Sequence, residues 1–210
     1  MTGETLGGVG AVLSEELERA RIAGEEGDAV ILVEGVSDQL ALETLAERQG
    51  RHLAAEGIAV IPIAGATNIG RFLDLLGPAG YDVRLGGVCD AAEEDDFRIA
   101  LGVAGVGSGR LDRDEMEHLG FFVCESDLED ELIRALGSDR MIALIESQGQ
   151  LRRFRSFQNQ PAQRHKTIEQ QLWRWLGNHK IRYAPLMVGA LDIQTVPRPL
   201  LMALTRPASH

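Results

Sequence analysis

The sequence lacks several features that define whole classes of protein. Its 210 residues contain no apolar run near the roughly 20 residues of a membrane-spanning helix. Its first 20 residues carry four glutamates, whereas a signal peptide has a basic start and an apolar core. The glycine-rich stretch 102–109 has no lysine, so it is not a phosphate-binding P-loop. We therefore expect a cytoplasmic protein with no membrane partner.

Cysteine is also scarce. Cys89 and Cys124 are the only two, too few for a disulfide framework or a zinc cluster. Each ends an apolar run, which predicts two buried, reduced thiols. With 44% hydrophobic and 25% charged residues, the chain has the composition of a globular protein with one well-cored domain and appendages.

Positive charge is low overall and unevenly distributed. The net charge is −11, which argues against a nucleic-acid partner. Residues 1–150 hold 11 basic and 30 acidic residues, whereas residues 151–182 hold eight basic residues and one acid, Glu169. A basic face can bind phosphates even on an acidic protein. The alternatives are a solvated surface or pairing with acids of the same chain. We expect residues 1–150 to form a core with an N-terminal helix, and residues 151–210 a basic helical extension packed on it.

Four short apolar runs, rich in β-branched residues, predict strands buried on both faces. They span residues 29–33, 58–63, 83–89 and 121–124. Helical patterns separate them, which indicates βαβ units and a mainly parallel sheet of about four strands flanked by helices. Further helices follow residue 137, and Pro185 is expected to break or kink one of them. The polar stretch 148–163 is the only candidate linker.

Carboxylates follow three of these strands. Glu34 ends the first, with Asp38 one helical turn later; Asp90 ends the third; Asp127 and Glu129 follow the fourth. The carboxyl ends of parallel strands share one edge of the sheet. Clustered, partly desolvated acids repel one another, and a divalent cation with a preference for oxygen ligands relieves that repulsion. The pattern therefore predicts a metal site.

Two of these acids have a purely structural alternative. Asp38 lies in a first helical turn that we expect Ser37 to cap, and any acid is favoured there by the helix dipole. Ser126-x-x-Glu129 is a capping box, which by itself could explain Glu129.

Three motifs resemble those of a known family. Ile31-Leu-Val-Glu34-Gly35-x-Ser37-Asp38 is similar to the first motif of TOPRIM domains, and Gly87-Val-Cys-Asp90 to the second. The segment from Cys124 to Leu132, with Asp127-Leu128-Glu129, resembles a motif of TOPRIM domains in OLD-family nucleases. The resemblance spans residues 28–190 and implies a TOPRIM, Rossmann-like α/β fold.

The resemblance also implies a site. Its metal ligands would be Glu34, Asp38, Asp90, Asp127 and Glu129, binding Mg²⁺ or Mn²⁺. Glu34, Asp90 and Glu129 would be catalytic, with Lys180 as the lysine that contacts phosphate.

The chain departs from the family in two respects. The second motif should read Asp-x-Asp, yet Ala92 stands at the second position. Glu93 or Glu94 could reach in from the next turn, although a helix would tend to point them elsewhere. OLD nucleases also carry an ATPase domain, for which these residues have neither a motif nor room. Length excludes a topoisomerase or primase, and neither Tyr81 nor Tyr183 has the context of a nucleophile.

The leading hypothesis is a metal-dependent nuclease that acts on DNA or RNA through backbone contacts. The alternative is a non-catalytic module with a degenerate metal site that binds nucleic acid or a protein partner. The number of metal ions, one or two, and the oligomeric state stay open.

Overall fold

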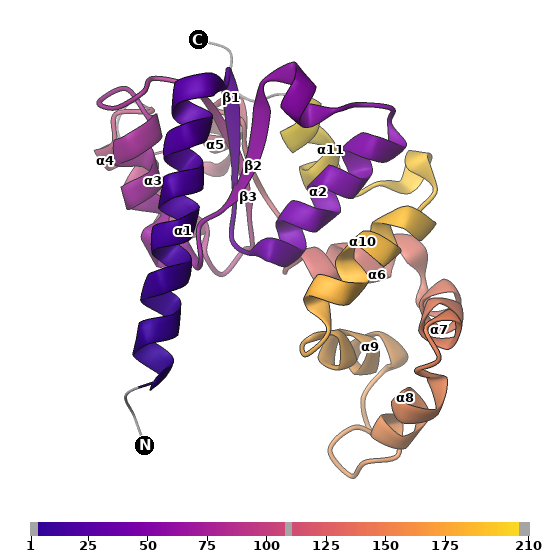
Figure 1. The fold of residues 1–210 in the computed structure, drawn as a ribbon. Helices are drawn as coiled ribbons and strands as arrows, with labels where there is room; N and C mark the ends of the chain where they lie inside the picture. Colours follow the sequence, from indigo (N-terminus) through magenta and orange to yellow (C-terminus); the bar gives the residue numbers. More distant parts are fainter. Residues whose placement is uncertain (1–3, 108–110, 206–210) are drawn as a thin grey trace.

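A four-stranded parallel sheet forms the centre of the computed structural model, which describes residues 4–107 and 111–205 (Figure 1). The strand order is β2-β1-β3-β4. The strands are β1 (Ala29–Val33), β2 (Ile58–Pro62), β3 (Arg84–Cys89) and β4 (Phe121–Val123). The predicted mainly parallel sheet of about four strands is confirmed.

The central strand β1 is buried on both faces because its five residues are all apolar. It pairs with β2 on one side and with β3 on the other, so that Val33 lies opposite both Pro62 and Val88. Strand β4 extends the sheet beyond β3, with Val123 opposite Cys89. This register brings the ends of β1, β3 and β4 to the same edge.

Two helical layers cover the sheet. One contains α1 (Glu4–Glu26), α3 (Ile69–Leu76), α4 (Glu94–Val103) and α5 (Arg113–His118). On the other side, α2 (Val36–Arg48) and α11 (Arg198–Thr205) contact the strands. The helices α6 (Leu128–Leu136), α7 (Ser138–Ser147), α8 (Leu151–Gln158), α9 (Ile168–Leu176) and α10 (Lys180–Ala190) pack against α2 and against one another. Short 3₁₀ turns span Leu53–Glu56, Ala66–Asn68 and Ile193–Thr195. Helices α1, α3 and α4 lie on one side of the sheet in Figure 1, and α2, α10 and α11 on the other. None of the described helices is long and apolar enough to cross a membrane.

The alternation of side chains along β1 divides the core between the layers. Val30 and Leu32 pack with Phe72 and Phe97 of the first layer. Ile31 and Val33 face the second layer, whose apolar cluster runs without interruption into α8–α11. Both cysteines are buried and free, as predicted.

Two hydrogen bonds from arginine side chains to backbone carbonyls connect the C-terminal helices α10 and α11 to the region of α2. The Arg48 guanidinium donates to the carbonyl of Val188 at 2.7 Å, and that of Arg51 to the carbonyl of Leu204 at 2.7 Å. Residues far apart in sequence thereby hold α10 and α11 against α2.

Three local predictions were wrong. The proposed linker 148–163 contains α8, whose Phe154 is fully buried against Trp175 with 5.5 Å between ring centroids. Pro185 lies inside α10 and does not end it, which contradicts the predicted break, whereas a kink at this residue stays a prediction. Ser37 does not cap α2, because the helix already begins at Val36. Of the glycine-rich stretch 102–109, residues 108 and 109 lie outside the described residues.

We predict that Gly87→Ala destabilises the protein by about 1–3 kcal/mol, because a methyl group at this position overpacks the sheet. An added Cβ would lie 2.7 Å from the carbonyl oxygen of Leu32 and 2.7 Å from the Phe121 ring. Urea unfolding followed by circular dichroism measures the change. Gly70→Ala is the matched control, since a Cβ there meets no atom within 4 Å. Equal stability of the two variants would contradict the close approach at β3.

Candidate metal centre

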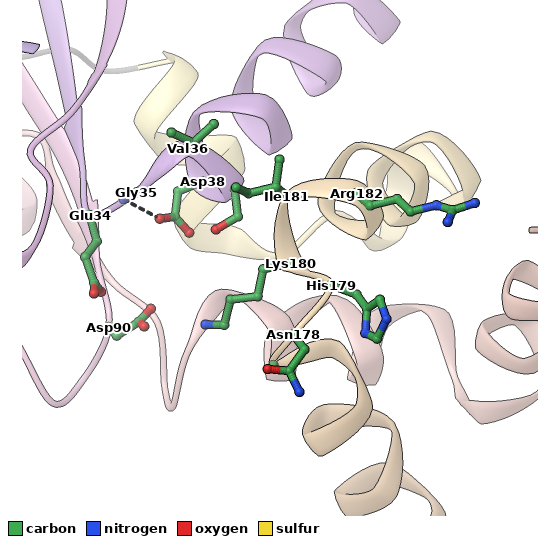
Figure 2. Close-up of a pocket in the computed structure, with 12 residues that line it drawn as sticks. Glu34, Gly35, Val36, Asp38, Asp90, Asn178, His179, Lys180, Ile181 and Arg182 are labelled. Atoms are coloured by element: carbon green, nitrogen blue, oxygen red, sulfur yellow. Dashed lines mark hydrogen bonds between the residues drawn. The ribbon is translucent and has the colours of Figure 1, made fainter. Parts of the chain in front are cut away.

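The ends of β1 and β3 place two acids side by side. Val33 pairs with Val88, so Glu34 and Asp90 emerge at the same edge of the sheet. The turn after Glu34 is fixed by a hydrogen bond from the Gly65 amide to the Glu34 carbonyl, at 3.2 Å. Figure 2 shows the side chains of Glu34, Asp38, Asp90 and Lys180 converging on one region.

Glu34, Asp90 and Glu93 form a group that can hold a metal ion. Each offers one carboxylate oxygen, and these oxygens lie within 4.8 Å of one another. All three residues are half-buried, and Oε2 of Glu93 is buried without a hydrogen-bond partner. Three convergent oxygens with an unsatisfied buried atom fit a divalent cation, since hard cations take carboxylate ligands.

The expectation that Glu93 points elsewhere was wrong. Glu93 precedes the first residue of α4, and from this position its side chain reaches Glu34 and Asp90. Glu94 does point elsewhere and pairs with Arg113. Glu93 therefore supplies a carboxylate to this group, whereas Ala92, at the second position of the Asp-x-Asp motif, offers none.

The pKa of Asp90 is raised to about 8, first by burial and then by the negative charges of Asp38 and Glu34. The amide of Leu128 donates to Asp90 Oδ1 at 3.2 Å, which links β3 to the start of α6. Burial, and then the charge of Glu93, also raises the pKa of Glu34. We call the sheet edge with Glu34, Asp38 and Asp90 the acidic rim. Its raised pKa values mean that binding of a proton or a cation to these carboxylates is favoured.

Asp38 lies on the first turn of α2 and faces the same region. Its Oδ2 accepts a hydrogen bond from the Gly35 amide at 2.9 Å. Burial raises the pKa of Asp38 to about 7, against that hydrogen bond and with help from the charges of Glu129 and Glu34. Asp38 does not belong to the group of three oxygens within 4.8 Å.

Asp127 uses both of its oxygens within the protein. Oδ1 accepts from the Asp130 amide at 2.8 Å, so Asp127 caps α6. Oδ2 accepts from the indole nitrogen of Trp173 at 2.5 Å. The predicted capping box of Ser126 and Glu129 was therefore wrong, since the cap is one residue later and its partner is Asp130.

Glu129 is buried, with 3% of its surface exposed, and is paired with Lys180. The Lys180 ammonium lies 2.7 Å from Glu129 Oε2, whereas Oε1 has no hydrogen-bond partner. Burial alone would lower the pKa of Lys180, but the hydrogen bond to Glu129 and the charges of Glu129, Asp127 and Asp90 raise it. Lys180 is therefore a cation fixed beside the carboxylates.

A cavity of about 680 Å³ opens onto this region. The first turn of α2 and the acids Glu34 and Asp90 form one wall, and residues 177–182, at the start of α10, form the other. Val36 and Ile181 also line the cavity and leave 39% and 59% of their surface exposed. The site thus combines acids, a lysine and apolar walls in one space.

Comparison with known proteins agrees with this architecture. Residues 27–90 match the family model described as the TOPRIM domain of Overcoming lysogenization defect protein-like proteins. The C-terminal region of the OLD protein of Xanthomonas campestris pv. campestris, solved with mercury, is 27% identical at a TM-score of 0.67. The match covers 86% of this chain and 94% of that one. Residues 27–90 therefore resemble an OLD-like TOPRIM domain, and most of the chain is similar to the C-terminal region of OLD proteins.

A second solved structure shows the same fold. The C-terminal region of the Burkholderia pseudomallei OLD protein superposes with a TM-score of 0.68 over 86% of this chain and 97% of that one, at 24% identity. No curated protein matches the chain. The TOPRIM match over residues 27–90 contains Glu34, Asp38 and Asp90, whereas Asp127, Glu129 and Lys180 follow it in the sequence.

The arginines of residues 151–182 form no ion pair in the described part of the chain. Six arginines between residues 151 and 182 are exposed. In the described part of the chain, Lys180 is the only one of the eight basic residues of this segment that forms an ion pair. Pairing with acids of the same chain therefore does not explain this segment.

We predict that the metal-free protein loses stability as the pH rises from about 5 to about 8. The raised pKa values of Asp90 and Asp38 mean that the native state keeps protons that the unfolded chain has released above pH about 4. Above pH 8 both states are deprotonated, and the native state then carries the full repulsion. Urea unfolding in chelator, repeated across this pH range, measures the slope.

Asp90→Asn should flatten that slope, because the amide cannot ionise. The control is Asp74→Asn at an exposed position of α3, which should keep the wild-type slope. A metal-free protein that gains stability between pH 5 and pH 8 would show that the acids are not crowded as described.

Proposed function

We propose that this protein is a divalent-metal-dependent nuclease that hydrolyses phosphodiester bonds of DNA or RNA. The observation that carries the proposal is the convergence of oxygens from Glu34, Asp90 and Glu93 within 4.8 Å, with Lys180 on the other wall of the same cavity. An OLD-like TOPRIM domain implies a metal-binding, nuclease-like module, which agrees with this chemistry.

Glu34, Asp90 and Glu93 would hold the ion, and the oxygen-only ligand set favours Mg²⁺ or Mn²⁺ over softer metals. Such an ion would supply Lewis acidity and charge neutralisation to a phosphoryl group. Asp38 stands behind this group and orients the turn at Gly35 through its hydrogen bond. Asp127 has both oxygens engaged, so we assign it a role in holding α6 and α9 in place.

The arrangement supports a single resident ion. Glu129, which the sequence placed among the ligands, has one oxygen on Lys180 and is not part of the three-oxygen group. The Lys180 ammonium thus supplies positive charge where a further cation would otherwise be needed. An ammonium group binds phosphate as a point charge, so Lys180 would neutralise the scissile phosphate.

The remaining residues contribute binding and proton transfer. The exposed arginines of residues 151–182 would contact the phosphate backbone, which gives sequence-independent affinity. Glu34 has a raised pKa and opens into the cavity, so it is the group we assign to accept a proton from the attacking water. In this view residues 1–150 carry the metal ligands and the proton acceptor, and residues 151–210 form the basic extension that supplies Lys180 and binds substrate.

A non-catalytic module is the second candidate, and one observation favours it. Ala92 is exposed and offers no ligand where the family has its second aspartate, so the metal site depends on Glu93. In that case the same cavity would bind nucleic acid or a protein partner without cleaving it.

We predict cleavage of DNA or RNA by the purified protein in Mg²⁺ or Mn²⁺. Glu34→Gln and Asp90→Asn each remove a charged ligand at nearly constant shape and should lower the rate by about 100-fold or more. Gel electrophoresis of labelled single- and double-stranded substrates measures it. Glu47→Gln, at an exposed position of α2, is the matched control and should cleave normally. Cleavage that survives both site substitutions would refute the assignment, and absence of cleavage in every metal would favour the module.

We further predict that calorimetry finds one Mn²⁺ per chain, with affinity that strengthens between pH about 5 and about 8 as Asp90 gives up its proton. Lys180→Met should bind Mn²⁺ more tightly, by about threefold or more, because a like charge is removed from beside the carboxylates. Two ions bound to the wild-type protein, or weaker binding in Lys180→Met, would contradict the single-ion arrangement.

A further inference from the structure

Trp173 is an exposed aromatic residue beside the acidic rim, and the hydrolysis proposed above does not use it. It leaves 42% of its surface exposed, whereas Trp175 leaves 8%. Leu172 and Leu176 of the same helix are fully buried. The side of α9 that faces away from the core therefore presents the Trp173 ring.

The ring is held in place by its polar edge. The indole nitrogen of Trp173 donates to Asp127 Oδ2 at 2.5 Å, and the other oxygen of Asp127 is fixed by the Asp130 amide. The hydrogen bond restrains the indole while much of its surface stays in solvent. A ring restrained in this way loses little conformational freedom when a ligand stacks on it.

The indole of Trp173 contacts an acid, Asp127, and basic and apolar residues lie in the adjoining segments. Arg174, the next residue, is exposed, and Lys180 lies at the start of the following helix. Val36 and Ile181 add exposed apolar surface on the walls of the neighbouring cavity. Aromatic platforms beside cations are the combination that binds single-stranded nucleic acid, with bases on the rings and phosphates on the cations.

The size of the site also favours a single strand. The cavity of about 680 Å³, which Lys180 lines and Trp173 does not, has the volume of a small-ligand pocket and so has room for one nucleotide-sized group of a longer strand. In a duplex the bases stack on one another, so their faces are not available to a side chain, whereas unpaired bases can be splayed out onto an aromatic ring.

We propose that Trp173 stacks on an unpaired base of a single-stranded nucleic acid whose phosphate backbone crosses the acidic rim at Lys180. The inference rests on the proposed function, because that function supplies the phosphate chain, and it deepens it by naming the substrate as single-stranded. Trp173 is then a specificity-determining residue.

Two substitutions separate the ring from its hydrogen bond. Trp173→Phe keeps an aromatic face and loses the N–H donor to Asp127, whereas Trp173→Gln keeps an N–H donor and loses the ring. Fluorescence anisotropy of a short fluorescein-labelled oligonucleotide measures binding, in EDTA and again in Ca²⁺, as a single strand and as the matching duplex. We expect Trp173→Phe to stay within about threefold of the wild type and Trp173→Gln to bind the single strand about 10- to 100-fold more weakly.

The other results would overturn the inference. Equal binding by Trp173→Gln and the wild type, or no binding of the single strand in either condition, would rule out stacking and leave the ring for a protein partner. Equal weakening in both variants would show that only the bond to Asp127 matters. A duplex that binds as tightly as the single strand, with the same dependence on Trp173, would refute the choice of substrate.

The binding experiment also distinguishes failure of stacking from failure of the proposed function, because it does not require hydrolysis. Trp173-dependent binding without cleavage in any metal would retain stacking and reject the nuclease. Cleavage that requires Glu34 and Asp90, with binding indifferent to Trp173, would retain the nuclease and reject stacking. Circular dichroism of both variants checks that the exposed substitutions leave the fold intact.

Discussion

The parallel pairing of β1 with β3 is the constraint on which the rest of the site depends. Val33 lies opposite Val88, so the chain leaves both strands at the same height and sets Glu34 beside Asp90. A one-residue slip would turn every side chain of β1 to the opposite face and separate the two acids. The apolar residues of β1 prevent such a slip, because each face of the strand is matched to a different helical layer. Packing of the core therefore also fixes the spacing of the carboxylates.

The second constraint is the balance between the carboxylates of the site and the positive charge available to them. Burial and mutual repulsion raise the pKa values of Glu34, Asp38 and Asp90, so the rim favours proton or cation binding. Lys180, on the opposite wall of the cavity, supplies one positive charge and forms an ion pair with Glu129. The chain thus neutralises Glu129 with its own Lys180, whereas Glu34, Asp90 and Glu93 have an arrangement that fits an external cation. The lack of an aspartate at position 92 is compatible with such a cation site, because Glu93 supplies a carboxylate oxygen to it.

The strands and the cluster of acids could be predicted from sequence for a simple reason. Fully buried parallel strands have unbroken apolar sequences. An acid directly after such a run therefore marks the carboxyl end of the strand, where the sites of parallel sheets form. Details that depend on a single helical step were not predictable. The cap of α6 lies at Asp127 and not at Ser126, and Glu93 turns inward because it precedes the first turn of α4.

Contacts between distant segments were equally hidden. No local pattern indicates that Trp173 donates to Asp127 or that Lys180 meets Glu129, since 46 and 51 residues separate the partners. Helix α8 was taken for a linker because the segment around it is polar and rich in arginine, and only the packing of Phe154 against Trp175 shows that the helix belongs to the core. Sequence patterns report what a segment prefers locally, whereas these contacts are chosen by the tertiary fold.

The position of Lys180 on α10 has a consequence for biosynthesis. All the carboxylates of the rim have emerged by Glu129, but their internal cation is translated about 50 residues later. Helices α10 and α11 then dock through the bonds of Arg48 and Arg51 to the carbonyls of Val188 and Leu204. A nascent chain that ends before α10 therefore carries the acids without their lysine. Until α10 is added, the buried carboxylate of Glu129 lacks the ammonium that it pairs with, so this part of the site is completed only when α10 docks.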